Sequence, residues 1–183
     1  MGWAGRDFTR HVGGRLCHHP VLANQLRKNL HEDRPMKIVV GSDHAGFAMK
    51  AGLMEFLRQR GHTVSDVGSY DPQPVDFPDI ARKVAAAITG GQAERGLMVC
   101  GTGVGAAIGA NKMKGIRAAV CHDVHSAHHC VEHDDVNVMC IGAQIVGPWL
   151  AKDLVAAYLD AKFSTDEDFR RRVEKLRVVD EQG

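Results

Sequence analysis

Residues 96–111 of the chain read GLMVCGTGVGAAIGAN. The apolar run at 96–99 predicts a buried strand, and the small residues at 106–111 predict a helix. The glycine-rich turn between them places free backbone N–H groups around one point. The side chains there that can take part in chemistry are the thiol of Cys100 and the hydroxyl of Thr102. Since a thiolate is favoured at a helix N-terminus, this stretch predicts a base or nucleophile beside an anion-binding loop.

Strands and helices alternate on both sides of this stretch, from Met36 onward. Near-continuous apolar runs predict five strands, at 38–41, 63–67, 97–100, 117–121 and 136–141. Periodic or capped segments predict helices at 45–60, 78–89, 106–113, 125–132, 148–161 and 166–176. This alternation predicts an α/β fold, a three-layer αβα sandwich of Rossmann-like type with a five-stranded parallel sheet and C-terminal helices.

The start of the chain differs from the rest. Residues 1–35 hold six Lys and Arg, three acids and four histidines, and they show no sustained apolar period. A targeting peptide is one interpretation, because the segment is rich in arginine and poor in acids at its start. We prefer a disordered extension, since serine and a clear amphipathic stretch are lacking. The sequence thus predicts an N-terminal extension at 1–35 and one domain at 36–183.

Composition narrows the class of protein. With 183 residues, 44% of them hydrophobic, the chain can bury a proper core. A formal net charge of +1 gives no reason to expect a nucleic-acid or membrane partner. No apolar run approaches the roughly 20 residues of a membrane span. The five cysteines form no close pair and no CxxC motif, which predicts a reduced, cytoplasmic protein.

Polar clusters follow three of the predicted strands: Asp43 with His44, residues 100–105, and residues 121–123. In parallel α/β folds, ligands bind outside the carboxyl ends of the strands. The first cluster is open to two interpretations. Asp43 can cap the next helix beside an uninvolved histidine, or the Asp–His pair can shuttle protons near neutral pH.

The glycine turn also fits a dinucleotide-binding pattern. Residues 101–106 match G-x-G-x-x-A, and Asp123 lies about 20 residues later, where a ribose-binding acid is expected. Against this interpretation, the turn follows the third predicted strand of a short domain, no substrate domain remains, and the turn opens with a cysteine. We therefore prefer a different use of the turn.

A histidine-rich segment fills residues 122–133. Its histidines are His122, His125, His128, His129 and His133. Because four of them share one face at helical spacing, a metal site is one interpretation. However, no paired Glu or Cys completes an obvious ligand set, so we expect a solvated or interface helix face and no bound metal.

Three consecutive arginines, at 170–172, lie in the last predicted helix. Consecutive helical residues point in different directions, so one or two of these guanidinium groups can serve a single site. Either they form a solvated surface, or they clamp an anion such as phosphate, which arginine binds in a bidentate manner.

Several short stretches, in order along the chain, resemble one known family. They are 41–47 (GSDHAGF), 100–105 (CGTGVG), 110–112 (ANK), 115–118 (GIRA), 132–134 (EHD), 137–138 (NV) and 172–173 (RV). Over about residues 36–177 the chain is similar to ribose-5-phosphate isomerase B and its galactose-6-phosphate isomerase relatives. The resemblance implies an aldose–ketose isomerase of a phosphorylated sugar that works through an enediolate, without metal or cofactor.

The resemblance also implies roles for the residues of the glycine turn. Cys100 is the expected base that moves a proton between two sugar carbons. Thr102 and the amides of Gly101, Gly103 and Gly105 are expected to hold the enediolate oxygen. Backbone donors around a thiolate suit this task physically.

Other expected site residues lie elsewhere in the chain. By the same resemblance, His133 and Asp43 assist ring opening and proton transfer between the sugar oxygens, while His44 and Arg172 contact the phosphate. The remaining expected substrate-binding residues are Asn111, Asp134 and Phe77. Family sites form across a dimer interface, so the resemblance implies a homodimer or tetramer whose small-molecule ligand is a sugar phosphate.

Four positions depart from the family pattern. They are Phe77, where tyrosine is usual; Asp134, often asparagine; Gln144, commonly arginine; and Asp168, in place of another arginine. The proton-transfer centre is intact, but the groups that hold the substrate are altered. The substrate is therefore of the ribose 5-phosphate type or another sugar phosphate such as a tetrose, and Arg170 or Arg171 is a candidate replacement cation.

A second hypothesis is a non-catalytic, sugar-phosphate-binding subunit of a paired isomerase. Some relatives of this kind work as paired subunits. The retention of Cys100, Thr102 and His133 favours the catalytic alternative.

Overall fold

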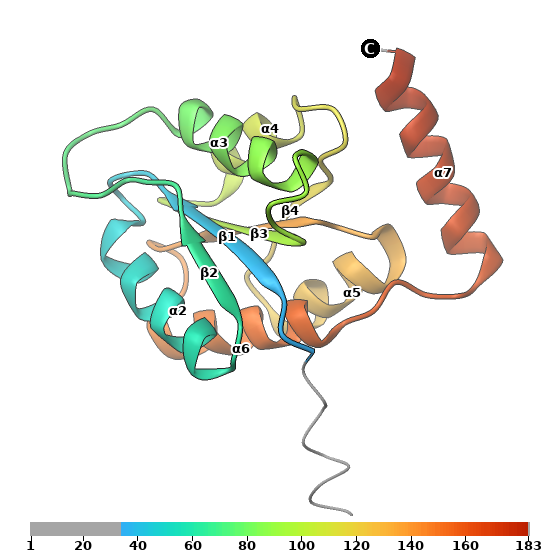
Figure 1. Cartoon of the computed structure of the whole chain (residues 1–183). Coiled ribbons are helices and arrows are strands. Elements are labelled where there is room, and N and C mark those ends of the chain that lie inside the picture. Colours follow the sequence, from blue (N-terminus) through green and yellow to red (C-terminus); the bar gives the residue numbers. More distant parts are fainter. Residues whose placement is uncertain (1–33, 183) are drawn as a thin grey trace, which may run out of the picture. The chain divides into compact units, whose positions relative to one another are not determined.

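A five-stranded parallel sheet forms the centre of the computed structural model, which describes residues 34–182 (Figure 1). The strand order is β2-β1-β3-β5-β4. The strands are β1 (Lys37–Ser42), β2 (Thr63–Asp66), β3 (Arg95–Cys100), β4 (Ala118–Val120) and β5 (Val138–Gly142). The predicted α/β fold is confirmed. The prediction for the N-terminal extension lies, up to residue 33, outside the described residues.

Helices cover both faces of the sheet (Figure 1). On one face lie α3 (Phe77–Thr89) and α4 (Val104–Ala110); on the other lie α2 (Phe47–Gln59), α5 (Val124–Asp134) and α6 (Pro148–Asp160). Within residues 34–182, no helix combines the length and apolar character needed to cross a bilayer.

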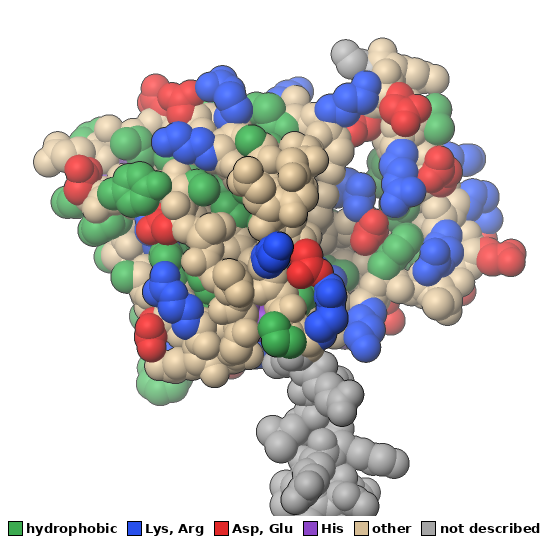
Figure 2. All heavy atoms as spheres, in the orientation of Figure 1, with side chains coloured by type: hydrophobic (Ala, Val, Ile, Leu, Met, Phe, Trp, Pro, Cys, Tyr) green, Lys and Arg blue, Asp and Glu red, His purple; other side chains and the backbone are tan. Residues whose placement is uncertain are grey.

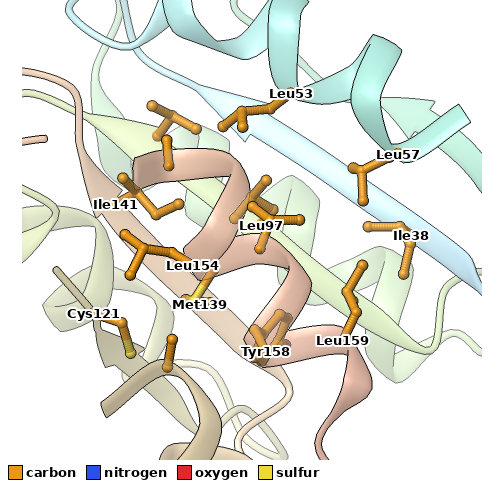
Figure 3. Packing of buried hydrophobic residues seen from close by; sticks show 14 of the residues in the cluster. Ile38, Leu53, Leu57, Leu97, Cys121, Met139, Ile141, Leu154, Tyr158 and Leu159 are labelled. Atoms are coloured by element: carbon orange, nitrogen blue, oxygen red, sulfur yellow. The ribbon is translucent and has the colours of Figure 1, made fainter. Parts of the chain in front are cut away.

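Alternate side chains of each central strand point to opposite faces of the sheet and pack in two separate hydrophobic cores. In β3, Leu97 and Val99 pack toward α2, α5 and α6. Figure 3 shows Leu97 among other residues of this cluster. Met98 and Cys100 point to the opposite face, toward α3 and α4. This period of two follows from the pleat of a strand. As a result, the thiol of Cys100 is directed to the α4 side of the sheet.

The last helix is longer than the sequence predicted. α7 runs over Glu167–Gln182, past the expected end at residue 176. The added residues, RVVDEQ, contain neither glycine nor proline, so nothing stops the helix. Basic and acidic side chains are interspersed along α7 on the face shown in Figure 2. By contrast, α4 ends at Ala110, before the expected residue 113, because a turn follows.

Candidate active site

The residues around Cys100 lie at a topological switch point of the sheet. β1 and β3 are neighbours, with Ser42 paired to Val99. The chain leaves β1 into α2 on one face and leaves β3 into α4 on the other (Figure 1). Open α/β sheets bind ligands in a crevice at such a point, between the two diverging loops. The two loops here are residues 43–46 and 100–105.

A backbone N–H group is directed at the Cys100 thiol. Cys100 is 5% exposed, and its Sγ accepts a hydrogen bond from the N–H of Gly103 at 3.0 Å. Gly103 has a φ of 82°, the left-handed conformation that glycine adopts without strain. Since α4 has only seven residues, the donors here belong to the loop rather than to a long helix. The arrangement suits a sulfur that carries negative charge.

The loop after β1 approaches β3 so closely that only glycine fits at position 46. A Cβ there would lie 2.1 Å from the Val99 carbonyl oxygen and 3.0 Å from the Cys100 nitrogen. Asp43 secures this approach, because its Oδ1 accepts the Gly46 N–H at 3.0 Å. The N–H of Asp43 also donates to the Val99 oxygen at 3.3 Å. Asp43 therefore has a structural role in the loop, and its role in proton transfer stays a prediction.

Thr102 and His44 are both exposed on this edge of the sheet. The Thr102 hydroxyl accepts the N–H of Val104 at 3.4 Å. The Nδ1 atom of His44 accepts the N–H of Val75 at 3.4 Å. These long contacts leave both side chains available to a ligand.

Phe77 covers the glycine loop from the α3 side. A Cβ at Gly105 would lie 3.0 Å from the tip of the Phe77 ring, and one at Gly109 would lie 3.6 Å from its edge. The ring thus packs directly on the glycines of α4. Because phenylalanine has no hydroxyl, Phe77 packs against the loop but cannot form a hydrogen bond with a ligand through its side chain.

The turn after β5 packs against the glycine loop that follows β3. Ala143 donates its N–H to the Cys100 oxygen at 2.8 Å, and Gln144 donates to the Gly101 oxygen at 3.0 Å. The Gln144 Oε1 atom lies 3.2 Å from the place where a Cβ of Gly101 would be. An uncharged amide therefore lies over the loop at the position where the family resemblance predicts arginine.

Within one chain, His133 and Arg172 lie far from this crevice. α5 begins beyond the carboxyl end of β4, and its 11 residues carry it about 16 Å toward the amino edge. There Arg117, just before β4, donates from Nε to the Asp134 oxygen at 3.1 Å. The His133 ring stacks on Phe169 of α7, with ring centroids 4.1 Å apart. The Arg172 guanidinium lies 5.6 Å from the centre of the Phe169 ring.

Asn111 and Asp134 also lie away from Cys100. Both line a hollow of about 600 Å³ between α7 and the start of β4. The side-chain amide of Asn111 donates to the Ala118 oxygen and accepts the Ala118 N–H, each at 2.8 Å. Asn111 thus secures β4, and the binding roles of Asn111 and Asp134 stay predictions.

Contrary to the expectation that no acid pairs with the histidines of α5, the carboxylate of Glu132 lies among them. The Nδ1 atom of His129 lies 3.0 Å from Glu132 Oε2 and 3.1 Å from His133 Nε2. Partial burial, followed by the neighbouring His125 and His133, lowers the pKa of His129. The spacing of three and four residues on one helix was a signal that could have found Glu132. The stacking of Phe169 on His133 had no such signal.

Asp123, the acid that a dinucleotide ribose would need, caps α5. Its carboxylate accepts the N–H of Ser126 at 2.8 Å and the Ser126 hydroxyl at 2.7 Å. These hydrogen bonds, the backbone one first, lower the pKa of Asp123. The carboxylate is therefore used by its own helix, which argues against the dinucleotide interpretation.

One known protein family matches most of the chain. Residues 38–176 match the family described as Ribose/Galactose Isomerase. The chain belongs to this family. The predicted class of enzyme, an aldose–ketose isomerase, is thereby confirmed.

Relatives in this isomerase family carry different substrate names. Ribose-5-phosphate isomerase B of Escherichia coli (strain K12) is 40% identical over 145 residues, 79% of this chain and 97% of that protein. D-erythrulose-4-phosphate isomerase of Pectobacterium atrosepticum is 44% identical over 131 residues, 70% and 85% of the two chains. The structure of Clostridium thermocellum ribose-5-phosphate isomerase B has a TM-score of 0.78 and 41% identity, covering 80% of this chain and 99% of that one.

Proposed function

We propose that the chain interconverts the aldose and ketose forms of a four-carbon sugar phosphate, with Cys100 as the base. The supporting observation is the Cys100 thiol at the switch point, with the Gly103 N–H 3.0 Å from its sulfur. In this reaction a base removes a proton from a carbon next to a carbonyl, and negative charge develops on the carbonyl oxygen. The exposed Thr102 hydroxyl suits that oxygen, and we assign the same task to the amides of Gly101 and Gly105, since the Gly103 N–H is directed at the sulfur.

The proton balance of the step is simple. The Cys100 thiolate takes the proton from one carbon, which leaves an enediolate, and returns it to the neighbouring carbon. A second proton passes between the two oxygens, and we assign this transfer to His133 with help from Asp43. His44 and Arg172 bind the phosphate through cationic or N–H donors. The reaction needs no external oxidant, because one carbon is oxidised as its neighbour is reduced.

The two groups of residues require two copies of the chain. Cys100 lies at the carboxyl edge of the sheet, while His133 and Arg172 lie near the opposite edge. A side chain cannot span the length of α5, about 16 Å. We therefore propose a homodimer in which His133 and Arg172 of one copy complete the crevice of the other.

The altered residues around the crevice favour a shorter substrate than ribose 5-phosphate. Gln144 supplies no positive charge over the loop, and Phe77 supplies no hydroxyl beside it. The Pectobacterium relative named for a four-carbon substrate is as similar as the ribose enzymes. A tetrose phosphorylated on its fourth carbon has no free hydroxyl that closes a five-membered ring, so its turnover needs no ring opening.

Turnover on a panel of substrates tests the proposal. The panel contains erythrulose 4-phosphate, ribulose 5-phosphate and a hexulose 6-phosphate, each followed as kcat/KM with the purified chain. We expect the tetrose to exceed the pentose by at least about tenfold, since a fitted pocket separates substrates by one carbon to that extent. A clear preference for the pentose would overturn the substrate assignment.

The non-catalytic subunit remains the second candidate. Its support is that the crevice of a single chain lacks His133. Turnover by this chain alone, with no other subunit present, excludes it.

A further inference from the structure

Three atoms of metal-binding type converge on a half-exposed face of α5. His129 Nδ1 lies 3.1 Å from His133 Nε2 and 3.0 Å from Glu132 Oε2. The third side of the triangle, from His133 Nε2 to Glu132 Oε2, measures 3.9 Å. We call these residues the α5 triad. Nothing in the proposed isomerase reaction requires His129 or Glu132 to be there.

The size of the triangle matches a zinc ion. Zinc binds imidazole nitrogen and carboxylate oxygen at about 2.0–2.2 Å, so neighbouring ligand atoms in a tetrahedral site are about 3.3 Å apart. The three separations in the triad lie on both sides of that value. For a triangle of these sides, a point about 2.0 Å from all three atoms exists.

The helix holds the three side chains in this arrangement. Residues 129, 132 and 133 are spaced by three and four, so they lie on one face, one turn apart. Stacking on Phe169 limits the rotation of the His133 ring, with ring planes only 6° from parallel. His133 lies in the last turn of α5, where the helix dipole attracts a cation.

An ion can reach the triad. The side chains of His129, Glu132 and His133 are 33%, 36% and 36% exposed. Two imidazoles and one carboxylate leave a fourth position open, which is the pattern of zinc sites that keep a water. The donor set of two nitrogens and one oxygen favours zinc and its neighbours over magnesium or calcium, which prefer oxygen ligands alone.

We propose that the α5 triad binds a zinc-type transition-metal ion, and that the bound ion inhibits the isomerase by occupying His133 Nε2. The inhibition rests on the proposed function, because it requires His133 to move protons during turnover. The binding of the ion rests on the triad alone. The metal acts here as a regulator and has no part in the chemical step.

Calorimetric titration of the full chain with zinc chloride tests binding without reference to activity. We expect one site per chain that is lost, or weakened at least about tenfold, in His129→Ala and in Glu132→Gln, because each removes one of three ligands. Sites elsewhere, including other histidines and cysteines, are unchanged by these substitutions, so the difference from the wild type isolates the triad. Equal binding by the wild type and His129→Ala would overturn the proposal.

His128→Ala is the matched control. His128 lies on the same helix and its Nε2 is 3.3 Å from Glu132 Oε2, but it is outside the triad. We expect this variant to keep the site. If it loses zinc as completely as His129→Ala, the assignment of the three ligands is wrong.

Inhibition is measured separately, as turnover with and without zinc and after addition of EDTA. We expect zinc to inhibit the wild type reversibly and to inhibit His129→Ala at concentrations at least about tenfold higher. Equal inhibition of both would place the inhibitory ion elsewhere, for example on the Cys100 thiol, and would overturn the regulatory part. A chain that binds zinc at the triad but turns over no sugar phosphate contradicts the proposed function and leaves the site standing.

Discussion

The glycine loop after β3 and the histidine face of α5 contribute to the same proposed reaction, but they are built differently. The interactions of the loop are mainly those of the backbone. Glycines allow β1, β3 and β5 to pack closely around it, and a backbone N–H donates to the Cys100 sulfur. The α5 face is made of half-exposed side chains on one regular helix. The difference teaches that chemistry at the loop is inseparable from the fold, whereas the helix face can change while the fold persists.

The largest effect should come from the proposed base of the loop, Cys100. Cys100→Ser keeps the shape but replaces the thiolate by a much weaker base, so we expect kcat to fall by about 10³-fold, within the range for a lost general base. The melting temperature should change little. Cys140→Ala, a second buried cysteine on the neighbouring strand β5, is the control and should keep its turnover. Normal activity in folded Cys100→Ser would refute the base assignment.

Adding a single carbon tests whether the loop is inseparable from the fold. In Gly46→Ala the new Cβ meets the Val99 carbonyl at 2.1 Å, so β1 or β3 must shift. We expect the free energy of unfolding to drop by about 3 kcal/mol, the upper range for overpacking. Gly52→Ala, in α2 with nothing within 4 Å, is the matched control and should raise stability by up to about 1 kcal/mol. Urea denaturation of both variants measures this, and equal stability contradicts the crowding argument.

The helix face should tolerate change without unfolding. His133→Asn should lower turnover by about 10²-fold through loss of proton transfer, with an unchanged melting temperature. The loss should be greater on ribose 5-phosphate, which must also open its ring, than on a tetrose phosphate. Steady-state kinetics on both substrates measure the two losses.

Mixing variants tests whether the two regions come from different copies. Cys100→Ser and His133→Asn, each strongly impaired alone, should regain about a quarter of wild-type activity when unfolded together and refolded, since half of random dimers carry one intact site. A mixture that stays inactive, although the dimers exchange, shows that each site belongs to one chain.

The smallest effect should come from the cap of α5. Asp123→Ala removes the hydrogen bonds to Ser126 and should lower the melting temperature by a few degrees at neutral pH. Because folding lowers the pKa of Asp123, this stabilisation is present above the ordinary aspartate pKa of about 4 and fades as pH falls through the folded value. The melting temperatures of the two proteins should therefore begin to converge as the pH falls below about 4. A difference that persists in acid contradicts the role of the carboxylate.

The two regions also differ in how far they can be predicted from sequence. The loop follows from local rules: an apolar run, glycines and a cysteine in one stretch. The separation of His133 from Cys100 can be predicted only by following the length of α5 away from the carboxyl edge of the sheet. The contact between Phe169 and His133 joins distant parts of the chain, so no spacing predicts it. The extra turns of α7 were missed because exposed Val178 and Val179 form no amphipathic pattern.

The edges of the sheet have a consequence for self-association. Both edge strands are short, with four residues in β2 and three in β4. At β4 the side-chain amide of Asn111 already bonds the Ala118 N–H and oxygen. These two hydrogen bonds replace those that a further strand would form with Ala118. Unpaired edges are the templates from which β-aggregates grow. Within residues 34–182, the β4 edge therefore offers an incoming strand few free backbone groups, so growth of the sheet at this edge is disfavoured.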